Sequence, residues 1–302
     1  MCTYNGEPYI IEQLESIRMQ SLTPDEVLIF DDISNDNTVE IIREFILKYH
    51  LEKSWHLYQN RKNKGWKKNF IDGMSVAKGD FIFPCDQDDI WESNKLEVLS
   101  NIIKKNSKIN VLTTNCKAFY DNGKIVVRPE PENGELIQQY LVTNFFGIRY
   151  PGCTYCIRNS YFKKIFNYWQ EDFPHDAFLY RFSMFDGSLY SLNTSLIKWR
   201  RHKDSTYSKE SLESKTLQNK INWIDYANRF ITSIENYLKN ESIEYEINWN
   251  ILKDSRNWLK ARKQFLITKN PINGIRLAKY IQYYPKKRQY LGDWYLFFSD
   301  RT

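Results

Sequence analysis

Residues 26–46 read EVLIFDDISNDNTVEIIREFI and combine a short apolar run, an acidic turn and an amphipathic pattern. The run Glu26–Phe30 ends at Asp31 and Asp32, which is typical of a strand buried in a parallel sheet. The polar residues up to Thr38 favour the start of a helix, and apolar residues then recur at helical spacing. The stretch therefore predicts a strand that leads directly into a helix.

The same alternation extends to both sides of this stretch. A helix is predicted over residues 8–20, a strand at 55–59, a helix at 69–77 and a strand at 81–84. Strands that alternate with helices over about 85 residues predict an open parallel sheet of the α/β class. The chain begins with what we expect to be only the end of a first strand, and we interpret this as a shortened strand or a start site assigned late.

The remainder of the chain changes in character. Four short strands are predicted, at 111–115, 118–120, 125–127 and 195–199. Three helices are predicted after residue 214, at 217–239, 247–266 and 271–283. Residues 197–302 carry 21 Lys/Arg against 11 Asp/Glu, whereas the preceding 196 residues carry 22 against 26. We therefore predict an α/β domain over residues 1–212 and a basic, aromatic-rich helical region over residues 213–302.

Composition excludes several classes of protein. The chain of 302 residues is 42% hydrophobic and 26% charged, as is usual for a globular protein. No apolar run approaches the roughly 20 residues that cross a bilayer, and no secretion signal opens the chain. The five cysteines form an odd, scattered set that favours a reducing cytoplasm.

Acidic residues follow two of the predicted strands. Residues 86–89, DQDD, place three carboxylates directly after FIFP, where like charges repel unless a cation neutralises them. Hard carboxylate oxygens suit Mg²⁺ or Mn²⁺. Taken alone, such a cluster is more often a solvated turn. Asp31 and Asp32 are similarly compatible with a helix cap or an Asx-turn, and Asp176, after Pro174, with a helix cap.

Seven segments together resemble the inverting glycosyltransferases of family two. They occur in the family's order between residues 1 and 207, namely CTYNGEPYI (2–10), DDISNDNT (31–38), NKGWKKNF (63–70), DQDDIW (86–91), PGCTYC (151–156), HDAFL (175–179) and WRRHKDST (199–206). Within the family, the chain is most similar to bacterial rhamnosyltransferase-like and capsular polysaccharide enzymes. The last hundred residues resemble only their variable helical tails.

The resemblance implies a fold and an activity. The fold would be GT-A, a Rossmann-like mixed sheet flanked by helices, with a helical C-terminal extension. The activity would be metal-dependent transfer of a sugar from dTDP-rhamnose or a UDP-hexose to a glycan or polyprenyl-diphosphate-linked acceptor, in the synthesis of capsule or O-antigen. The alternatives are a non-catalytic GT-A-like module and a basic polyanion-binding module; a sugar nucleotidyltransferase lacks support because residues 1–64 contain Gly6 as their one glycine.

The resemblance also assigns roles to residues of this chain. Asp176 would be the catalytic base, Asp88 would ligate Mn²⁺ or Mg²⁺, and His202 would lie near the metal or diphosphate. The residues expected to bind the nucleotide-sugar are Thr3, Tyr4, Glu7, Asp31, Asp32, Lys68, Asp86, Gly152 and His175.

Several of these residues have simpler interpretations. Asp32 is favoured over Asp31 as the acceptor for a base imide. Lys68 could be a solvated lysine, and His175 and His202 could be surface histidines. Asp89 is expected to support its loop through hydrogen bonds. The pair Cys153 and Cys156 is interpreted as buried thiols rather than a zinc or redox site, because no second Cys/His pair matches it.

The C-terminal region also carries expectations about partners. An aromatic stripe over residues 223–237 is expected to pack on the α/β domain or on a partner subunit, which would allow a homodimer. Residues 276–298 mix basic and aromatic side chains and predict a helix lying on an anionic bilayer. We therefore expect a cytoplasmic protein at the inner face of the cell membrane that binds no nucleic acid.

Overall fold

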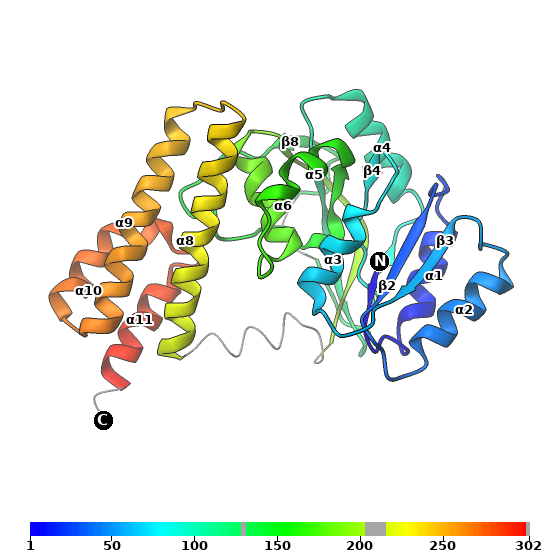
Figure 1. The fold of residues 1–302 in the computed structure, drawn as a ribbon, viewed down its shortest axis with the longest axis horizontal. Coiled ribbons are helices and arrows are strands. Elements are labelled where there is room, and N and C mark those ends of the chain that lie inside the picture. Colours follow the sequence, from blue (N-terminus) through cyan, green and yellow to red (C-terminus); the bar gives the residue numbers. More distant parts are fainter. Residues whose placement is uncertain (128–130, 203–215, 300–302) are drawn as a thin grey trace. The chain divides into compact units, whose positions relative to one another are not determined.

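The structure, a computed structural model, describes residues 1–127, 131–202 and 216–299 (Figure 1). The chain divides into two compact units. The N-terminal unit consists of Met1–Gln139, Tyr150–Ser183 and Ser188–Arg201, and the C-terminal unit consists of the described parts of Tyr140–Arg149, Met184–Gly187 and His202–Thr302. The expected boundary between residues 212 and 213 lies outside the described residues.

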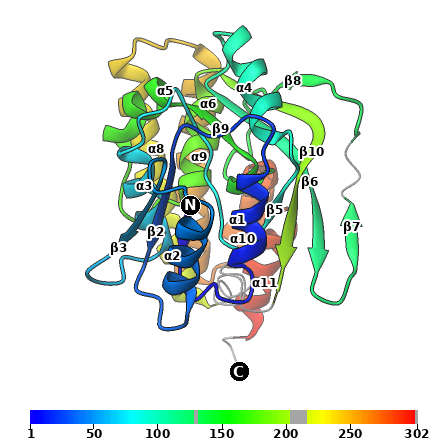
Figure 2. The same ribbon diagram turned by 90° about the vertical axis from the view of Figure 1, so that its right-hand side faces the viewer.

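A three-stranded parallel sheet opens the N-terminal unit (Figure 2). Its order is β1 (Cys2–Thr3), β2 (Val27–Asp31) and β3 (Trp55–Gln59). Helices α1 (Ile10–Arg18) and α2 (Thr38–Lys48) connect these strands, and their apolar faces are buried against the sheet. The strand–helix alternation predicted around residues 26–46 is confirmed.

A second sheet of seven strands follows the path β4–β9–β6–β10–β5, with β7 beside β6 and β8 beside β10. The strands are β4 (Phe81–Ile82), β5 (Ile90–Trp91), β6 (Val111–Tyr120), β7 (Ile125–Val127), β8 (Leu136–Gln138), β9 (Cys156–Arg158) and β10 (Leu189–Arg201). Strands β6 and β10 run parallel, and the other pairs given for this sheet are antiparallel. The architecture is therefore a mixed sheet of the α/β class, as predicted.

The strand predicted at residues 81–84 exists, but the prediction that it joins the parallel sheet is wrong. Phe81 and Ile82 pair antiparallel with β9 in the second sheet. The link to the first sheet is a hydrogen bond from the backbone N–H of Cys2 to the carbonyl of Cys85, 3.1 Å long. Two paired residues carry too little pattern to reveal which strand will be their neighbour.

Four helices of the N-terminal unit complete its layers, namely α3 (Trp66–Ser75), α4 (Lys95–Lys105), α5 (Asn159–Ile165) and α6 (His175–Phe185). Helix α4 was not predicted, although Leu96, Leu99 and Ile103 recur at helical spacing and are buried. Helix α6 ends in Met184 and Phe185, which belong to the C-terminal unit. Strand β10 is longer than its predicted core at 195–199 and contains register shifts typical of β-bulges.

The C-terminal unit is helical. Its elements are α8 (Leu217–Asn240), α9 (Glu246–Thr268), α10 (Pro271–Leu277), the 3₁₀ segment η3 (Ala278–Tyr283) and α11 (Arg288–Ser299). Helices α8 and α9 lie side by side (Figure 1). The predicted aromatic stripe packs inside this unit, because Phe230 and Tyr237 are fully buried and the ring of Trp223 lies 5.9 Å from that of Trp258.

The prediction that residues 276–298 form one continuous helix is wrong. The chain leaves the helical conformation at Tyr284 and Pro285, since η3 ends before them and α11 begins after them. Tyr283, Tyr284 and Phe297 are buried within the unit. In the described part of the chain, no helix has both the length and the apolar character that crossing a membrane requires.

A buried carboxylate holds the C-terminal unit together. Asp293 of α11 has no exposed surface. It accepts hydrogen bonds from Arg262 Nε (2.8 Å), Lys220 Nζ (2.8 Å) and the hydroxyl of Tyr284 (2.8 Å). These two cations keep the pKa of Asp293 below its ordinary value in spite of the burial. Helices α8, α9 and α11 therefore meet at one ion-pair network.

The substitution Asp293→Asn should destabilise the C-terminal unit by about 3–5 kcal/mol, because it leaves Arg262 and Lys220 buried without a counter-charge. The matched control is Asp225→Asn on α8, whose carboxylate forms a 2.7 Å ion pair with Lys263 at the surface. That change should cost no more than about 1 kcal/mol. Urea denaturation followed by circular dichroism measures both, and equal losses would contradict the role given to Asp293.

Candidate active site

The acidic loop, residues 86–89, connects β4 to β5, and strand β10 anchors it. The backbone N–H of Arg200 donates to Asp89 Oδ1 (2.9 Å), and Arg200 Nε donates to the backbone carbonyl of Asp88 (2.8 Å). Asp89 is fully buried, whereas Asp86 and Asp88 are half-buried. The expectation that Asp89 supports the loop through hydrogen bonds is confirmed.

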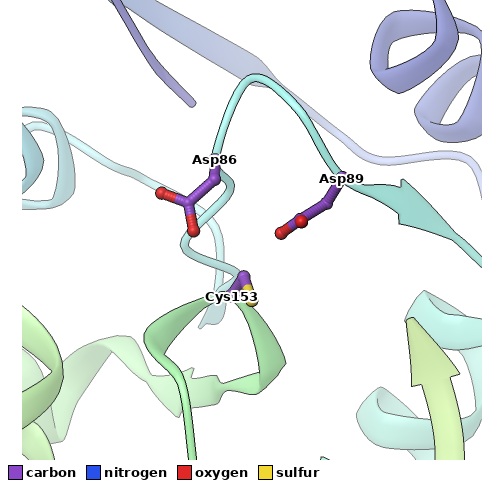
Figure 3. Close-up of side chains that lie close together, drawn as sticks. All are labelled: Asp86, Asp89 and Cys153. Carbon is purple, nitrogen blue, oxygen red and sulfur yellow. The ribbon is translucent and has the colours of Figure 1, made fainter. Parts of the chain in front are cut away.

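Asp86 and Asp89 point toward the thiol of Cys153 (Figure 3). Their carboxylate oxygens and the Cys153 sulfur all lie within 4.8 Å of one another. Asp88, the expected metal ligand, is not a member of this group, but its negative charge acts on both carboxylates and helps to raise their pKa values. Asp88 therefore lies outside the group that Asp86 and Asp89 form with Cys153, and it affects that group through its charge.

Electrostatics connect the acidic loop to the expected catalytic base. Burial, together with the negative charges of Asp88 and Asp176, raises the pKa of Asp86 to about 7. Asp176 itself has a raised pKa, mainly because it is buried. The structure thus brings Asp176 close enough to the acidic loop for its charge to disfavour ionisation of Asp86, although about 90 residues separate them in the sequence.

Gly152 and the first residues of helix α6 lie very close to each other. Asp176 lies in the first turn of α6, and its Oδ1 accepts a 2.6 Å hydrogen bond from the N–H of Ala177. Gly152 begins the 3₁₀ turn η1 (Gly152–Thr154). A Cβ atom at Gly152 would lie 2.4 Å from His175 Nε2 and 3.0 Å from Asp176 Cβ. Glycine is therefore required at residue 152 for the turn to approach the start of the helix.

His175 is buried rather than a surface histidine, at 4% exposure. Its ring stacks on Phe70 at 4.0 Å between centroids and meets the edge of Trp66 at 6.1 Å. Burial lowers its pKa to about 3, so the imidazole is neutral at physiological pH. Neither ring nitrogen has a hydrogen-bond partner within the described residues. A neutral imidazole offers one donor and one acceptor, which together suit a hydroxyl group.

Asp31 is fully buried at the end of β2. Its Oδ2 accepts a 2.9 Å hydrogen bond from the hydroxyl of Thr3, which lies opposite it in the parallel register. Its Oδ1 accepts a 2.9 Å hydrogen bond from the backbone N–H of Ser34. These contacts shape the turn after β2, in agreement with the Asx-turn alternative.

Asp32 organises the segment that leads into α3. Its carboxylate accepts hydrogen bonds of 2.8 Å from the Asn60 side chain and from the backbone N–H groups of Lys64 and Gly65. Only 3% of Asp32 is exposed. The side chain thereby fixes the loop over residues 60–65.

Tyr4 is about half exposed at the end of β1. Its backbone N–H donates to Gln87 Oε1 (2.8 Å), and its carbonyl accepts from Gln87 Nε2 (3.1 Å). Gln87 was not predicted as a functional residue. A Cβ atom at Gly6 would lie 2.4 Å from Gln87 Oε1, so this glycine makes room for the amide.

The other expected residues have the following surroundings. Glu7 is half-buried, and its Oε1 accepts a 2.8 Å hydrogen bond from Asn37. Lys68 forms a 2.9 Å ion pair with Asp72 on its own helix, and Lys64 forms a 2.9 Å ion pair with the same carboxylate. His202 is half-buried and belongs to the C-terminal unit.

Lys95 is a second residue that sequence reasoning missed. It is fully buried, and its Nζ donates a 2.6 Å hydrogen bond to the carbonyl of Cys153 and lies 3.7 Å from the centroid of the Trp91 ring. Burial lowers its pKa to about 8. The ammonium group of Lys95 thus attaches helix α4 to η1, which contains Cys153. The signal for Lys95 in the sequence was its position shortly after DQDDIW. A lysine that is buried in a helix requires a partner.

The comparisons with known proteins identify the family of the chain. The family described as Glycosyl transferase family 2 matches residues 1–187. The dTDP-rhamnosyl transferase RfbG of Shigella flexneri is 35% identical over 193 residues, which cover 61% of this chain and 64% of RfbG. The glycosyltransferase GlyG of Streptococcus pneumoniae is 35% identical over 96 residues, which cover 32% of this chain and 31% of GlyG. The chain thus spans less than two thirds of either relative.

Solved structures show the same fold. TarS 1–349 of S. aureus in complex with UDP-GlcNAc superposes with a TM-score of 0.59 and 19% identity, covering 92% of this chain and 89% of TarS. GalNAc-T7 with UDP, GalNAc and Mn²⁺ superposes with a TM-score of 0.56 and 14% identity, covering 86% of this chain and 50% of that chain. The predicted GT-A fold is confirmed. Because the family match extends over more than half of its residues, the chain belongs to glycosyl transferase family 2.

Proposed function

We propose that the protein transfers a sugar from a nucleotide-diphosphate donor to an acceptor hydroxyl, with inversion at the anomeric carbon. The observation that carries this proposal is the approach of Asp176 to the acidic loop, where its charge helps to raise the pKa of Asp86. An inverting transfer needs one base beside the donor diphosphate. Asp176 is the carboxylate to which we assign that role.

Asp176 takes the proton of the acceptor hydroxyl as the hydroxyl oxygen bonds to the anomeric carbon. The bond between that carbon and the diphosphate oxygen breaks, and the nucleoside diphosphate leaves with the electron pair. The raised pKa of Asp176 makes it a stronger base than an exposed aspartate. The neutral ring of His175 beside it is suited to orienting a sugar hydroxyl.

We propose Asp86 and Asp88 as the residues that hold a divalent cation, Mn²⁺ or Mg²⁺. The oxygen donors of the loop fit a hard cation, and the mutual repulsion that raises the pKa of Asp86 is what a cation would relieve. When bound, the cation offsets the charge that develops on the leaving diphosphate.

Donor and acceptor are proposed by class. The name of the relative RfbG supports dTDP-rhamnose as the donor, and the UDP-GlcNAc bound to TarS supports a UDP-hexose. The donor would lie at the ends of β1 and β2 and beside η1, near Thr3, Tyr4, Glu7, Asp31, Asp32, Lys68, Gly152 and His175. The acceptor would be a glycan or a polyprenyl-diphosphate-linked glycan of the cell surface, such as capsule or O-antigen.

We further propose that the C-terminal unit contacts an anionic membrane surface in the cytoplasm. Its last elements expose apolar side chains, among them Ile275, Leu291 and Tyr295, each more than 65% exposed. They also expose five basic side chains, Arg276, Lys279, Lys286, Lys287 and Arg288. Exposed apolar groups with interspersed cations favour binding at a lipid interface.

The first test concerns the cation. Wild-type protein should release nucleotide from one member of a panel of dTDP- and UDP-sugars in a manner that EDTA abolishes. Asp88→Asn should lower turnover at least about 100-fold, or about 2.7 kcal/mol, without unfolding, because the substitution retains the backbone carbonyl of Asp88 to which Arg200 Nε donates. Asp80→Asn, at the exposed start of β4, is the control and should retain activity. Full turnover in EDTA, or no hydrolysis of any donor, would refute the proposal, and the latter would favour a binding module.

The second test concerns the base. Asp176→Asn should bind the nucleoside diphosphate as wild type does while transfer falls at least about 100-fold, because the change affects the transition state alone. In the wild type, the base acts only when ionised, so the rate should decline with falling pH from a higher pH than an ordinary aspartate allows. Glu171→Gln, exposed just before α6, is the control. Transfer within a few-fold of wild type would leave Asp176 as a structural residue.

The third test concerns the membrane. Truncation after residue 270 is unsuitable because it removes Asp293 from Arg262, so substitutions are required. Replacing Lys286, Lys287 and Arg288 by Gln should weaken binding to phosphatidylglycerol-containing vesicles by about 3 kcal/mol, or roughly 100-fold at low salt. The matched control replaces the exposed Lys104, Lys105 and Lys108 by Gln. Equal sedimentation of the two triple variants would contradict the proposed surface.

A further inference from the structure

Cys153 and Cys156 have the spacing of a zinc or redox pair, yet the structure separates their surroundings. Cys153 is buried in one core cluster with Cys85 and Cys116, whereas Cys156 is buried in another with Leu99 and Leu112. Both are free thiols. The two sulfurs therefore do not act as a pair, and the partners of Cys153 must be sought elsewhere.

Those partners are two carboxylates of the acidic loop. The sulfur of Cys153 and one oxygen each from Asp86 and Asp89 lie within 4.8 Å of one another, and Figure 3 shows the three side chains converging. Asp86 and Asp89 come from the loop between β4 and β5, and Cys153 comes from the turn η1. Helix α4 holds η1 in position, because Lys95 Nζ donates a hydrogen bond to the carbonyl of Cys153.

Asp89 supplies an independent sign of a ligand. Its Oδ1 accepts from the backbone of Arg200, and the thiol of Cys153 also hydrogen-bonds to this side chain. In the described part of the chain, no donor outside the cluster reaches the buried Oδ2. The carboxylate points toward Cys153 and Asp86 (Figure 3). A thiol is a weak donor for a buried carboxylate. A cation in place of the thiol proton would satisfy the carboxylate better.

We propose that Asp86, Asp89 and Cys153 form a site for a thiophilic divalent cation such as Zn²⁺, in addition to the all-oxygen site proposed for Mn²⁺ or Mg²⁺. Two carboxylates and one thiolate leave a fourth position for water, which is the arrangement of an open zinc site. The sulfur ligand favours zinc over magnesium, which prefers oxygen alone.

Distance and charge both fit this cation. Bonds of about 2.0–2.3 Å in a tetrahedron place ligand atoms roughly 3.5 Å apart, so side-chain rotations that contract the group by about 1 Å would complete the site. Two carboxylates and a thiolate carry three negative charges, and a divalent cation with the nearby ammonium of Lys95 carries three positive ones. Binding breaks the Cys153 S–H bond, forms a sulfur–metal bond and releases the thiol proton, with any proton on the two carboxyl groups, to solvent, without electron transfer.

Occupation of this site has one consequence that rests on the function proposed above. Asp86 belongs to both sets of ligands, so a zinc ion held by Cys153 would withdraw Asp86 from the donor diphosphate. Zn²⁺ should then inhibit transfer even in the presence of Mn²⁺. The direct test below measures metal binding by itself, so its result is independent of whether the protein transfers a sugar.

The test uses Co²⁺ as a spectroscopic probe on full-length protein that has been reduced and freed of metal. Wild type should bind one equivalent with a sulfur-to-cobalt charge-transfer band, and Zn²⁺ should displace it. Cys153→Ser should lose the band, while the matched control Cys156→Ser should keep it. Asp89→Asn should keep the band at saturation but weaken binding by at least about tenfold.

Each outcome of the cobalt titration either supports the proposed site or overturns it. A band that persists in Cys153→Ser, that disappears equally in Cys156→Ser, or that is absent from wild type would overturn the proposal. Circular dichroism confirms that each variant is folded before titration. If Cys153→Ser is unfolded, the cobalt affinity of Asp89→Asn decides whether the site exists. Unchanged affinity in that folded variant would exclude Asp89 as a ligand and refute the site.

Discussion

The contact on which the site depends is the pair of hydrogen bonds from Arg200 to the acidic loop. One fixes the carboxylate of Asp89 and the other fixes the backbone of Asp88, and both come from the end of the longest strand of the second sheet. Without this anchor, three carboxylates within four residues would separate by repulsion. The guanidinium itself is neutralised by Glu12 and Asp121, which attach β10 to α1 and to the turn after β6.

Local patterns explain which parts of the fold could be predicted. Strands β2 and β3 and helices α1 and α2 were predicted because each has enough apolar residues at one period to identify it. The strand that pairs with β4 was not predicted correctly, because two residues can indicate a strand without indicating its neighbour. At the C-terminus, composition predicted an exposed amphipathic helix, whereas Tyr284 is buried beside Asp293. A mixture of aromatic and basic residues is equally compatible with a buried ion-pair network, and only packing distinguishes the two.

For the candidate site as well, the sequence predicted which residue types are important but not which residues contact one another. The motifs identified Asp86 and Asp176, and the structure places them within electrostatic reach of one another. The neighbours of Cys153 could not be predicted, since its CxxC spacing pointed to Cys156 and its neighbours come from a loop more than 60 residues earlier. Lys95 was missed for a related reason, because a lysine in an amphipathic helix is ordinarily solvated and its burial follows from Trp91 and the carbonyl of Cys153.

The division of the chain into units affects how its segments could be recombined with those of relatives. The C-terminal unit includes Tyr140–Arg149 and Met184–Gly187 as well as the helices at the end of the chain. Asn248 of α9, for example, donates to the carbonyl of Phe185, and Tyr237 of α8 donates to Asp186. An exchange of the helical tail between relatives at a single crossover near residue 202 would therefore separate these residues from their partners. Viable chimaeras would need to carry three segments together, so the tail is inherited as part of a discontinuous unit rather than as an interchangeable module.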